Sequence, residues 1–337
     1  MNETLESVAI AMGARGRGIL AADESSGTIK KRFDTIGVIS TEETRRDYRE
    51  MLFSTTRAMH DNISGVILYD ETIRQNAKDG TPLVKLIRNA GSIPGIKVDM
   101  GAKPMPGFPG EKVTEGLDGL AERLTEYYAL GARFAKWRAV LDISSTIPTS
   151  ACIKANMHAL ARYAALCQQA NIVPIVEPEV LMDGDHNIDC CYEATHATLR
   201  VLFDELIEQK VMLEGTVLKP NMVISGKKCP QQATPEEVAE KTIRCFKHTV
   251  PAAIPSIVFL SGGQSDIDAT ANLNAINVRG GFPWQMSFSY GRALQAAPLK
   301  AWGGKPENAS AAQAALTHRA TMNGLATKGE WRPFLEK

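Results

Sequence analysis

The chain contains 337 residues, of which 44% are hydrophobic and 23% charged, the composition of an ordinary folded protein with enough length for a large core. Its 38 basic residues balance 38 acidic ones, so the charge argues against a nucleic-acid-binding or membrane-surface protein, and neither partner is expected. Six cysteines occur without a C-x-x-C pair, which favours reduced thiols over a zinc site or a redox pair. No apolar run approaches the ~18 residues of a membrane-spanning helix, and arginines interrupt the N-terminal apolar run, so we expect a cytoplasmic protein without a signal peptide.

Short apolar segments recur along the chain, at residues 18–22, 65–69, 95–99, 132–138, 172–179, 215–219, 256–261 and 285–289. They are almost continuous in Ile, Val, Leu and Phe, which is typical of parallel strands buried on both faces. Helical patterns lie between them. Residues 40–43 and 234–237 match capping boxes, residues 117–130 and 156–169 place apolar side chains at helical spacing, and residues 309–325 form an Ala-rich terminal helix.

Eight strands alternating with helices predict an α/β protein with a single (β/α)8 TIM barrel. No Pro-, Gly- or Ser-rich linker divides the chain, so we expect one domain over residues 1–337. An open doubly wound sheet is the alternative, but it calls for a glycine-rich turn after the first strand, and residues 23–27 read DESSG there.

Polar residues follow or end most of the predicted strands: Asp23, Lys97, Asp99, Lys136, Arg138, Glu177, Glu179, Lys219 and Ser261. Residues two apart on a strand point to the same face. In a barrel the carboxyl ends of the strands converge where active sites lie. A solvated rim would explain one such charge, but charges at the same end of five strands favour a functional site.

Lys219 ends an apolar strand, and an unpaired lysine in a barrel interior is costly. Partial burial and a neighbouring cation such as Lys136 would depress its pKa and make a nucleophilic amine available. A structural ion pair with Glu177 or Glu179 is the alternative. The two interpretations are compatible, because an amine nucleophile needs a proton carrier beside it.

Two groups of residues are suited to binding phosphate. Ser261, Gly262 and Gly263 end the seventh strand, and Ser289, Gly291 and Arg292 precede a short helix after the eighth, which together make the usual phosphate site of this fold. Lys97, with Lys31 and Arg32, could hold a second anion, although the latter two could equally lie on a solvated helix face.

A metal site is not expected. The six histidines show neither H-x-H nor H-E-x-x-H spacing, and none ends a strand. The segment 183–186, DGDH, is interpreted as a structural turn.

Seven motifs in the same order resemble class I fructose-1,6-bisphosphate aldolase, the metal-independent Schiff-base type. They are LAADES at 20–25, GIKVD at 95–99, FAKWR at 134–138, VPIVEPE at 173–179, LKPNM at 218–222, LSGGQ at 260–264 and FSYGR at 288–292. The resemblance runs from about residue 18 to residue 304, and its motifs are together highly specific.

The resemblance implies a lyase without a cofactor that reversibly cleaves fructose 1,6-bisphosphate into dihydroxyacetone phosphate and glyceraldehyde 3-phosphate, in glycolysis and gluconeogenesis. It makes Lys219 the Schiff-base lysine, Glu177 its acid and base, and Asp23 the group that takes the C4 hydroxyl proton, with Lys136 and Glu179 in the same network. The C1 phosphate would lie at Ser261, Gly262, Gly263, Ser289, Gly291 and Arg292, and the distal phosphate end at Ser25, Arg32, Lys97 and Arg138. A homotetramer is also implied.

Two other functions remain open at this stage: another Schiff-base aldolase or transaldolase, and a binding scaffold. Two separate phosphate sites argue against the first, and an intact Lys219, Glu177 and Asp23 argue against a role that is only scaffolding.

Many family members end in a mobile tail with a final tyrosine that moves a proton on dihydroxyacetone phosphate, whereas the last tyrosine here is Tyr290. We expect residues 328–337 to be a loosely packed tail and that proton exchange to be comparatively slow.

Overall fold

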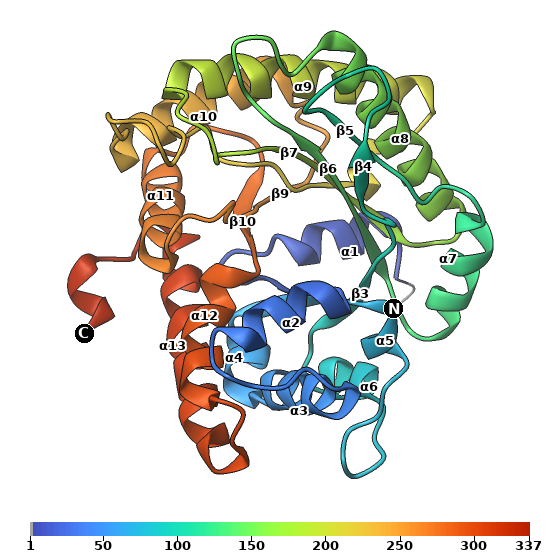
Figure 1. Cartoon of the computed structure of the whole chain (residues 1–337), viewed down its shortest axis with the longest axis vertical. Coiled ribbons are helices and arrows are strands. Elements are labelled where there is room, and N and C mark those ends of the chain that lie inside the picture. The colour runs from blue at the N-terminus through green and yellow to red at the C-terminus, as the bar shows by residue number, and fades with distance from the viewer. Residues whose placement is uncertain (1–2) are drawn as a thin grey trace.

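Eight parallel strands close into a barrel surrounded by helices in the computed structural model, which describes residues 3–337 (Figure 1). Around the barrel the strands follow the order β1-β10-β9-β8-β7-β6-β3-β2. Their bounds are β1 (Gly18–Ala22), β2 (Ile63–Leu68), β3 (Ile93–Lys97), β6 (Phe134–Leu141), β7 (Val173–Val180), β8 (Val217–Leu218), β9 (Ser256–Phe259) and β10 (Gln285–Tyr290). The predicted fold class is therefore confirmed.

The helices connect successive strands and pack around the barrel (Figure 1). They are α1 (Leu5–Met12), α2 (Ser26–Asp34), α3 (Glu42–Phe53), α4 (Thr56–Asp61), α5 (Asp70–Ile73), α6 (Leu83–Asn89), α7 (Leu120–Ala129), α8 (Ser150–Gln169), α9 (Ile188–Glu208), α10 (Pro235–Thr249), α11 (Asp266–Arg279), α12 (Arg292–Trp302) and α13 (Ala309–Ala326). Short 3-10 turns lie at η1 (Leu213–Gly215), η2 (Pro306–Asn308) and η3 (Pro333–Glu336). None of the helices in residues 3–337 is long and apolar enough to cross a membrane.

Each of the eight predicted strands lies at its expected place in the chain, with shifted ends. β6 and β7 run to Leu141 and Val180, beyond the charged residues at which they were expected to stop, because both strands remain buried and paired there. A short antiparallel hairpin, β4 (Ala102–Pro104) with β5 (Lys112–Thr114), was not predicted. Strands of three residues carry too little periodicity to be recognised in a sequence.

The capping box predicted at 234–237 is confirmed: Thr234 begins α10 with a reciprocal bond to Glu237, and proline is at the first position of the helix. The one predicted at 40–43 lies one residue later, because Thr41 rather than Ser40 begins α3 and pairs reciprocally with Thr44. These side chains satisfy backbone groups that the first helical turn leaves unpaired.

The N-terminal apolar segment forms α1, which closes the amino-terminal end of the barrel. Its buried side chains join a core cluster contributed by strand residues that face the barrel interior. Serines near the starts of two strands hold it: Ser256 Oγ donates to the carbonyl of Ala9 at 2.8 Å, and Ser64 Oγ to that of Met12 at 2.6 Å. Because this end is filled and bonded, the open end of the barrel is the carboxyl one.

Phe134 fills the barrel interior, and glycines on the neighbouring strands make room for it. A Cβ on Gly95 would lie 2.2 Å from the Phe134 ring, and one on Gly65 would lie 2.9 Å from it. Such contacts are far shorter than atoms tolerate, so each glycine is required by packing.

The segment 328–337, for which loose packing was expected, is exposed at Phe334 but is anchored elsewhere. Trp331 is buried and donates its indole N–H to Glu336 at 2.8 Å. Glu336 also pairs with the buried Arg319 of α13. The first two residues of the expected domain lie outside the described residues.

Candidate active site

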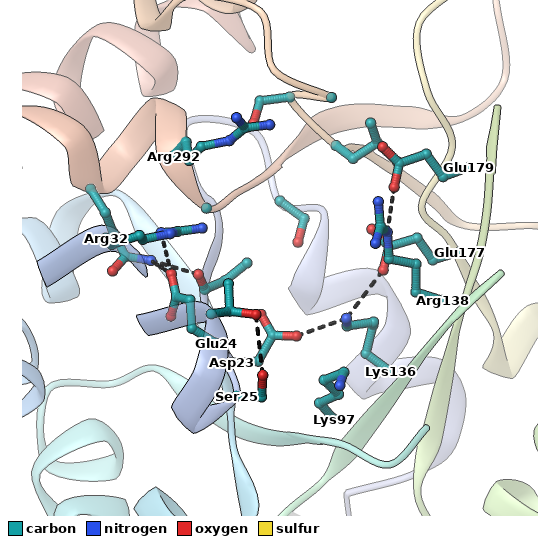
Figure 2. A pocket seen from close by; sticks show the side chains of 18 of the residues that line it. Asp23, Glu24, Ser25, Arg32, Lys97, Lys136, Arg138, Glu177, Glu179 and Arg292 are labelled. Carbon is teal, nitrogen blue, oxygen red and sulfur yellow. Dashed lines mark hydrogen bonds and ion pairs between the residues drawn. The ribbon is translucent and has the colours of Figure 1, made fainter. Parts of the chain in front are cut away.

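A cavity of about 960 Å³ lies at the carboxyl end of the barrel (Figure 2). Of the residues predicted to form the site, all except Gly263 line it, and Glu24, Thr28, Lys31 and Gln295 line it as well. The structure therefore brings together side chains that lie up to 269 positions apart, from Asp23 to Arg292.

A chain of ion pairs crosses the floor of the cavity. Lys219 Nζ lies 3.1 Å from Glu177 Oε1, and Lys136 Nζ lies 3.3 Å from the other oxygen of Glu177 and 2.7 Å from Asp23 Oδ2. Lys219, Lys136 and Glu177 are almost fully buried. Strand register explains the arrangement, because these side chains project from β6, β7 and the ends of β8 and β1 toward one point.

Asp23, Glu177 and Lys136 are ionised despite their burial, because each lies beside groups of opposite charge. Burial alone would raise the pKa of Asp23, but Lys136 and Lys219 outweigh it and hold that pKa far below its usual range. Burial likewise acts to raise the pKa of Glu177, and Lys219 and Lys136 lower it below the ordinary value. Burial would lower the pKa of Lys136, but Asp23 and Glu177 raise it above the ordinary value. Near neutral pH, Lys136 is therefore an ammonium between two carboxylates.

Glu179 is not part of this chain of ion pairs. Its carboxylate pairs with Arg138 of β6, as Figure 2 shows. Lys97 pairs with Asp99 at 3.2 Å, and the other oxygen of Asp99 accepts from the backbone N–H of Arg138 at 3.3 Å. Among residues 3–337 Glu179 contacts neither Lys219 nor Lys136 through an ion pair, so the structure separates the two glutamates that sequence reasoning grouped together.

Sequence reasoning missed a buried network under Arg32. Glu24 pairs with Arg32 and accepts from the amide of Gln295 at 2.9 Å. Arg49, only 1% exposed, donates to the backbone carbonyl of Glu24 at 2.7 Å. The single clue in the sequence was a second carboxylate directly after Asp23, whereas Arg49 lies on a helix and its burial is decided by tertiary packing.

The predicted phosphate residues after β9 and β10 lie on one side of the cavity. Gly262 and Gly263 have φ of +57° and +91°, which only glycine adopts readily. Ser289 is 1% exposed, and its Oγ has no hydrogen-bond partner among residues 3–337. Arg292 begins α12, whose N-terminus favours an anion. A Cβ on Gly291 would lie 3.6 Å from Arg32 Nη2, so Arg32 also reaches this side.

Of the residues predicted for the distal phosphate, Ser25 lies near the start of α2, with its Oγ 3.1 Å from the hydroxyl of Thr28. Lys97 and Arg138 lie on the part of the cavity formed by β3 and β6. In Figure 2 Arg32 and Arg292 appear on one side and Lys136 and Arg138 on the other. The cavity that contains the buried Lys219 is therefore lined by cationic side chains at two separate places.

Within residues 3–337 no cluster of three His, Cys, Asp or Glu side chains has the geometry to hold a metal ion. All six cysteines are free, and four of them are buried. Asp183 in the segment 183–186 pairs with Lys227.

The comparisons with known proteins agree with this geometry. The family described as fructose-bisphosphate aldolase class-I matches residues 4–337. A probable class 1 fructose-bisphosphate aldolase of Xanthomonas campestris is 60% identical over 331 residues, covering 98% of this chain and 99% of the relative. Fructose-bisphosphate aldolase 1 of Toxoplasma gondii is 54% identical, covering 95% and 88%.

A solved structure, a ternary complex of fructose-bisphosphate aldolase from Plasmodium falciparum with TRAP and a small-molecule inhibitor, superimposes with a TM-score of 0.95. It is 50% identical, and the match covers 97% of this chain and 95% of that one. The resemblance seen in the motifs is thereby confirmed over nearly the whole length. The chain belongs to the class I fructose-bisphosphate aldolases, the glycolytic lyases that cleave fructose 1,6-bisphosphate.

Proposed function

We propose that Lys219 is the residue of this aldolase that forms the Schiff base with the C2 ketone of the substrate. The observation that carries the proposal is the position of Glu177, which lies between Lys219 and Lys136 at the closed floor of the cavity. Glu177 first takes one proton from the Lys219 ammonium beside it, and the free amine attacks the C2 carbonyl. The nitrogen then loses a second proton, which goes to the former carbonyl oxygen and gives a carbinolamine. Glu177 returns the first proton to that hydroxyl, so that water leaves and the protonated iminium forms.

Carbon–carbon cleavage follows at Asp23. Its carboxylate takes the proton of the C4 hydroxyl, the C3–C4 bond breaks, and the bonding electrons move into the protonated iminium. Lys136, bonded to Asp23 and Glu177, keeps both carboxylates ionised and positioned. Glu179 acts indirectly in this proposal, by holding Arg138 at the substrate.

The phosphates are proposed to lie on opposite parts of the cavity. Ser261, Gly262, Gly263, Ser289, Gly291 and Arg292 would receive the C1 phosphate, which supplies the missing partner of the Ser289 hydroxyl. Ser25, Lys97 and Arg138 would receive the distal phosphate. Arg32, which the resemblance assigns to the same group, lies on the side of Gly291 and Arg292 and is not included in it. We further propose a single catalytic domain ending in the anchored segment 328–337, cytoplasmic location and a homotetramer, as the family resemblance implies.

Borohydride reduction tests the proposed chemistry. Reduction in the presence of dihydroxyacetone phosphate should inactivate the enzyme irreversibly and add the mass of one reduced adduct per chain. Borohydride without that ligand should leave the activity unchanged, because no imine is present to be reduced. Full activity after treatment with both reagents would contradict a Schiff-base mechanism.

Chelation should not affect cleavage. The iminium at Lys219 accepts the electrons that a metal ion would otherwise stabilise, so a millimolar excess of EDTA is expected to leave kcat and KM within experimental error. The measurement is a coupled assay of triose phosphate release after dialysis against the chelator. Loss of activity that zinc restores would overturn the mechanism.

Replacing Arg292 with alanine should weaken substrate binding far more than it affects folding. A guanidinium–phosphate hydrogen bond contributes about 1.5–3 kcal/mol, which corresponds to a KM roughly 10- to 150-fold higher. The side chain is exposed and has no ion-pair partner within residues 3–337, so the melting temperature should barely change. Arg279→Ala on α11, an exposed arginine paired with Glu240, is the matched control. A large fall in melting temperature with an unchanged KM would favour a structural role.

A further inference from the structure

The loops that follow β7 and β8, at the carboxyl end of the barrel, are joined backbone to backbone. Three N–H groups of the second loop donate to the first: Gly226 to His186 at 2.8 Å, Lys227 to Met182 at 2.7 Å, and Lys228 to Gly184 at 3.0 Å. A Cβ on Gly226 would lie 2.3 Å from the carbonyl oxygen of Gly184, so the approach needs glycine. The backbone of Lys227 is therefore held in one place.

The side chain of Lys227 reaches the turn after β9. A Cβ built on Gly263 would lie 2.4 Å from Lys227 Nζ and 2.9 Å from Arg292 Nη2. The two cationic nitrogens therefore lie no farther apart than the sum of these distances. The φ of +91° at Gly263 and the absence of a side chain leave room for both.

This convergence of cations needs an explanation. Lys227 has one carboxylate nearby, Asp183 at 3.0 Å, and that carboxylate is 63% exposed. Arg292 has none within residues 3–337. Like charges repel at short range, so two cations aimed at one glycine are expected where an anion binds between them. Ser289, near the end of β10, also lines the cavity, and its buried hydroxyl has no hydrogen-bond partner within residues 3–337.

We propose that Lys227 is a further substrate-binding residue, which holds a phosphate monoester together with Arg292 at the turn 261–263. The inference rests on the proposed function, because it takes that turn to be the site of the C1 phosphate. When the phosphate arrives, the Lys227 ammonium exchanges Asp183 for a phosphate oxygen. The dianion then lies among the ammonium, the guanidinium and the N-terminus of α12.

The competing explanation is that Lys227 and Asp183 only tie the two loops together. The backbone bonds described above already join those loops, and an exposed ion pair adds little to stability. A residue that only joins the two loops would not need to place its ammonium against Gly263, as Lys227 does. Kinetics can separate the two explanations because a loop tie needs both partners, whereas a phosphate ligand needs only the lysine.

The test compares four variants in the cleavage assay, with inorganic phosphate as a competitive inhibitor. Lys227→Met should raise the KM for fructose 1,6-bisphosphate and the inhibition constant of phosphate on the order of tenfold, with kcat within about twofold. Lys227→Arg should retain most of the affinity. Asp183→Asn removes the competitor for the ammonium, so both constants should stay unchanged or fall. Lys228→Met, an exposed neighbour on the same loop, is the control and should behave as the unaltered enzyme.

Two results would overturn the inference: unchanged constants in Lys227→Met, or an equal rise of both constants in Lys227→Met and Asp183→Asn. Failure of the underlying proposal is distinguishable. If the C1 phosphate does not bind at this turn, Arg292→Ala will leave KM and phosphate inhibition unchanged as well. If the C1 phosphate binds there but Lys227 does not hold it, Arg292→Ala will raise both constants while Lys227→Met leaves them unchanged.

Discussion

Lys219→Arg is expected to abolish turnover. Arginine keeps a positive charge beside Glu177, but a guanidinium remains protonated at any accessible pH and offers no free amine to form an imine. Every later step needs the iminium as electron acceptor. The activity should therefore fall to the background of the assay, a larger loss than replacement of any substrate-binding residue would cause. The reduced adduct with dihydroxyacetone phosphate should disappear in parallel.

Peptide mapping of the reduced adduct in the unaltered enzyme gives the sharper result. We expect the label on the peptide that contains Lys219, since Lys136 is held between two carboxylates and Lys97 is paired with Asp99. Lys219→Met, which lacks the bulk of arginine, checks that inactivity does not come from crowding in a buried site. Label on Lys136 or Lys97 would refute the assignment, as would residual trapping in both Lys219 variants.

Glu177→Gln is expected to lower kcat by about 10²–10⁴-fold, the usual contribution of a positioned acid–base group. Glutamine keeps the shape and can still accept a hydrogen bond from Lys219, but it cannot carry the proton between the amine and the departing hydroxyl. The rate at which borohydride-trappable adduct forms should fall with kcat, because imine formation is the step at which Glu177 acts.

The control for this variant is Glu179→Gln. Glu179 lies two residues away on the same strand and pairs with Arg138 rather than with a lysine of the floor. The Glu179→Gln variant should have a higher KM than the unaltered enzyme but form the adduct at close to the normal rate. Removing the Glu177 charge from a buried pair can cost about 3–5 kcal/mol of stability, so each variant is assayed well below its melting temperature. Equal loss of adduct formation in both variants would contradict the separate roles.

Much of the fold was predictable because a parallel strand buried on both faces leaves an unmistakable apolar run. All eight runs became barrel strands, and both predicted capping-box segments became helix starts, the first of them one residue later at Thr41, since these signals arise from residues close in sequence. The gathering of strand-end charges at one rim was predictable for the same reason, because parallel strands share a direction.

The partners of those charges were decided only when the barrel closed. That Lys219 and Lys136 share Glu177, that Lys136 reaches Asp23 across 113 positions, and that Glu179 pairs with Arg138 all depend on register and strand order across the ring. The burial of Arg49 beneath Glu24 and the approach of Lys227 to Gly263 depend on loops and helices that carry no local signal of their destination. The sequence by itself thus determined which elements form and which end of the barrel is charged, because those follow from local periodicity. Which charge faces which was determined by the tertiary structure, because it requires contacts between residues that lie from 25 to 113 positions apart.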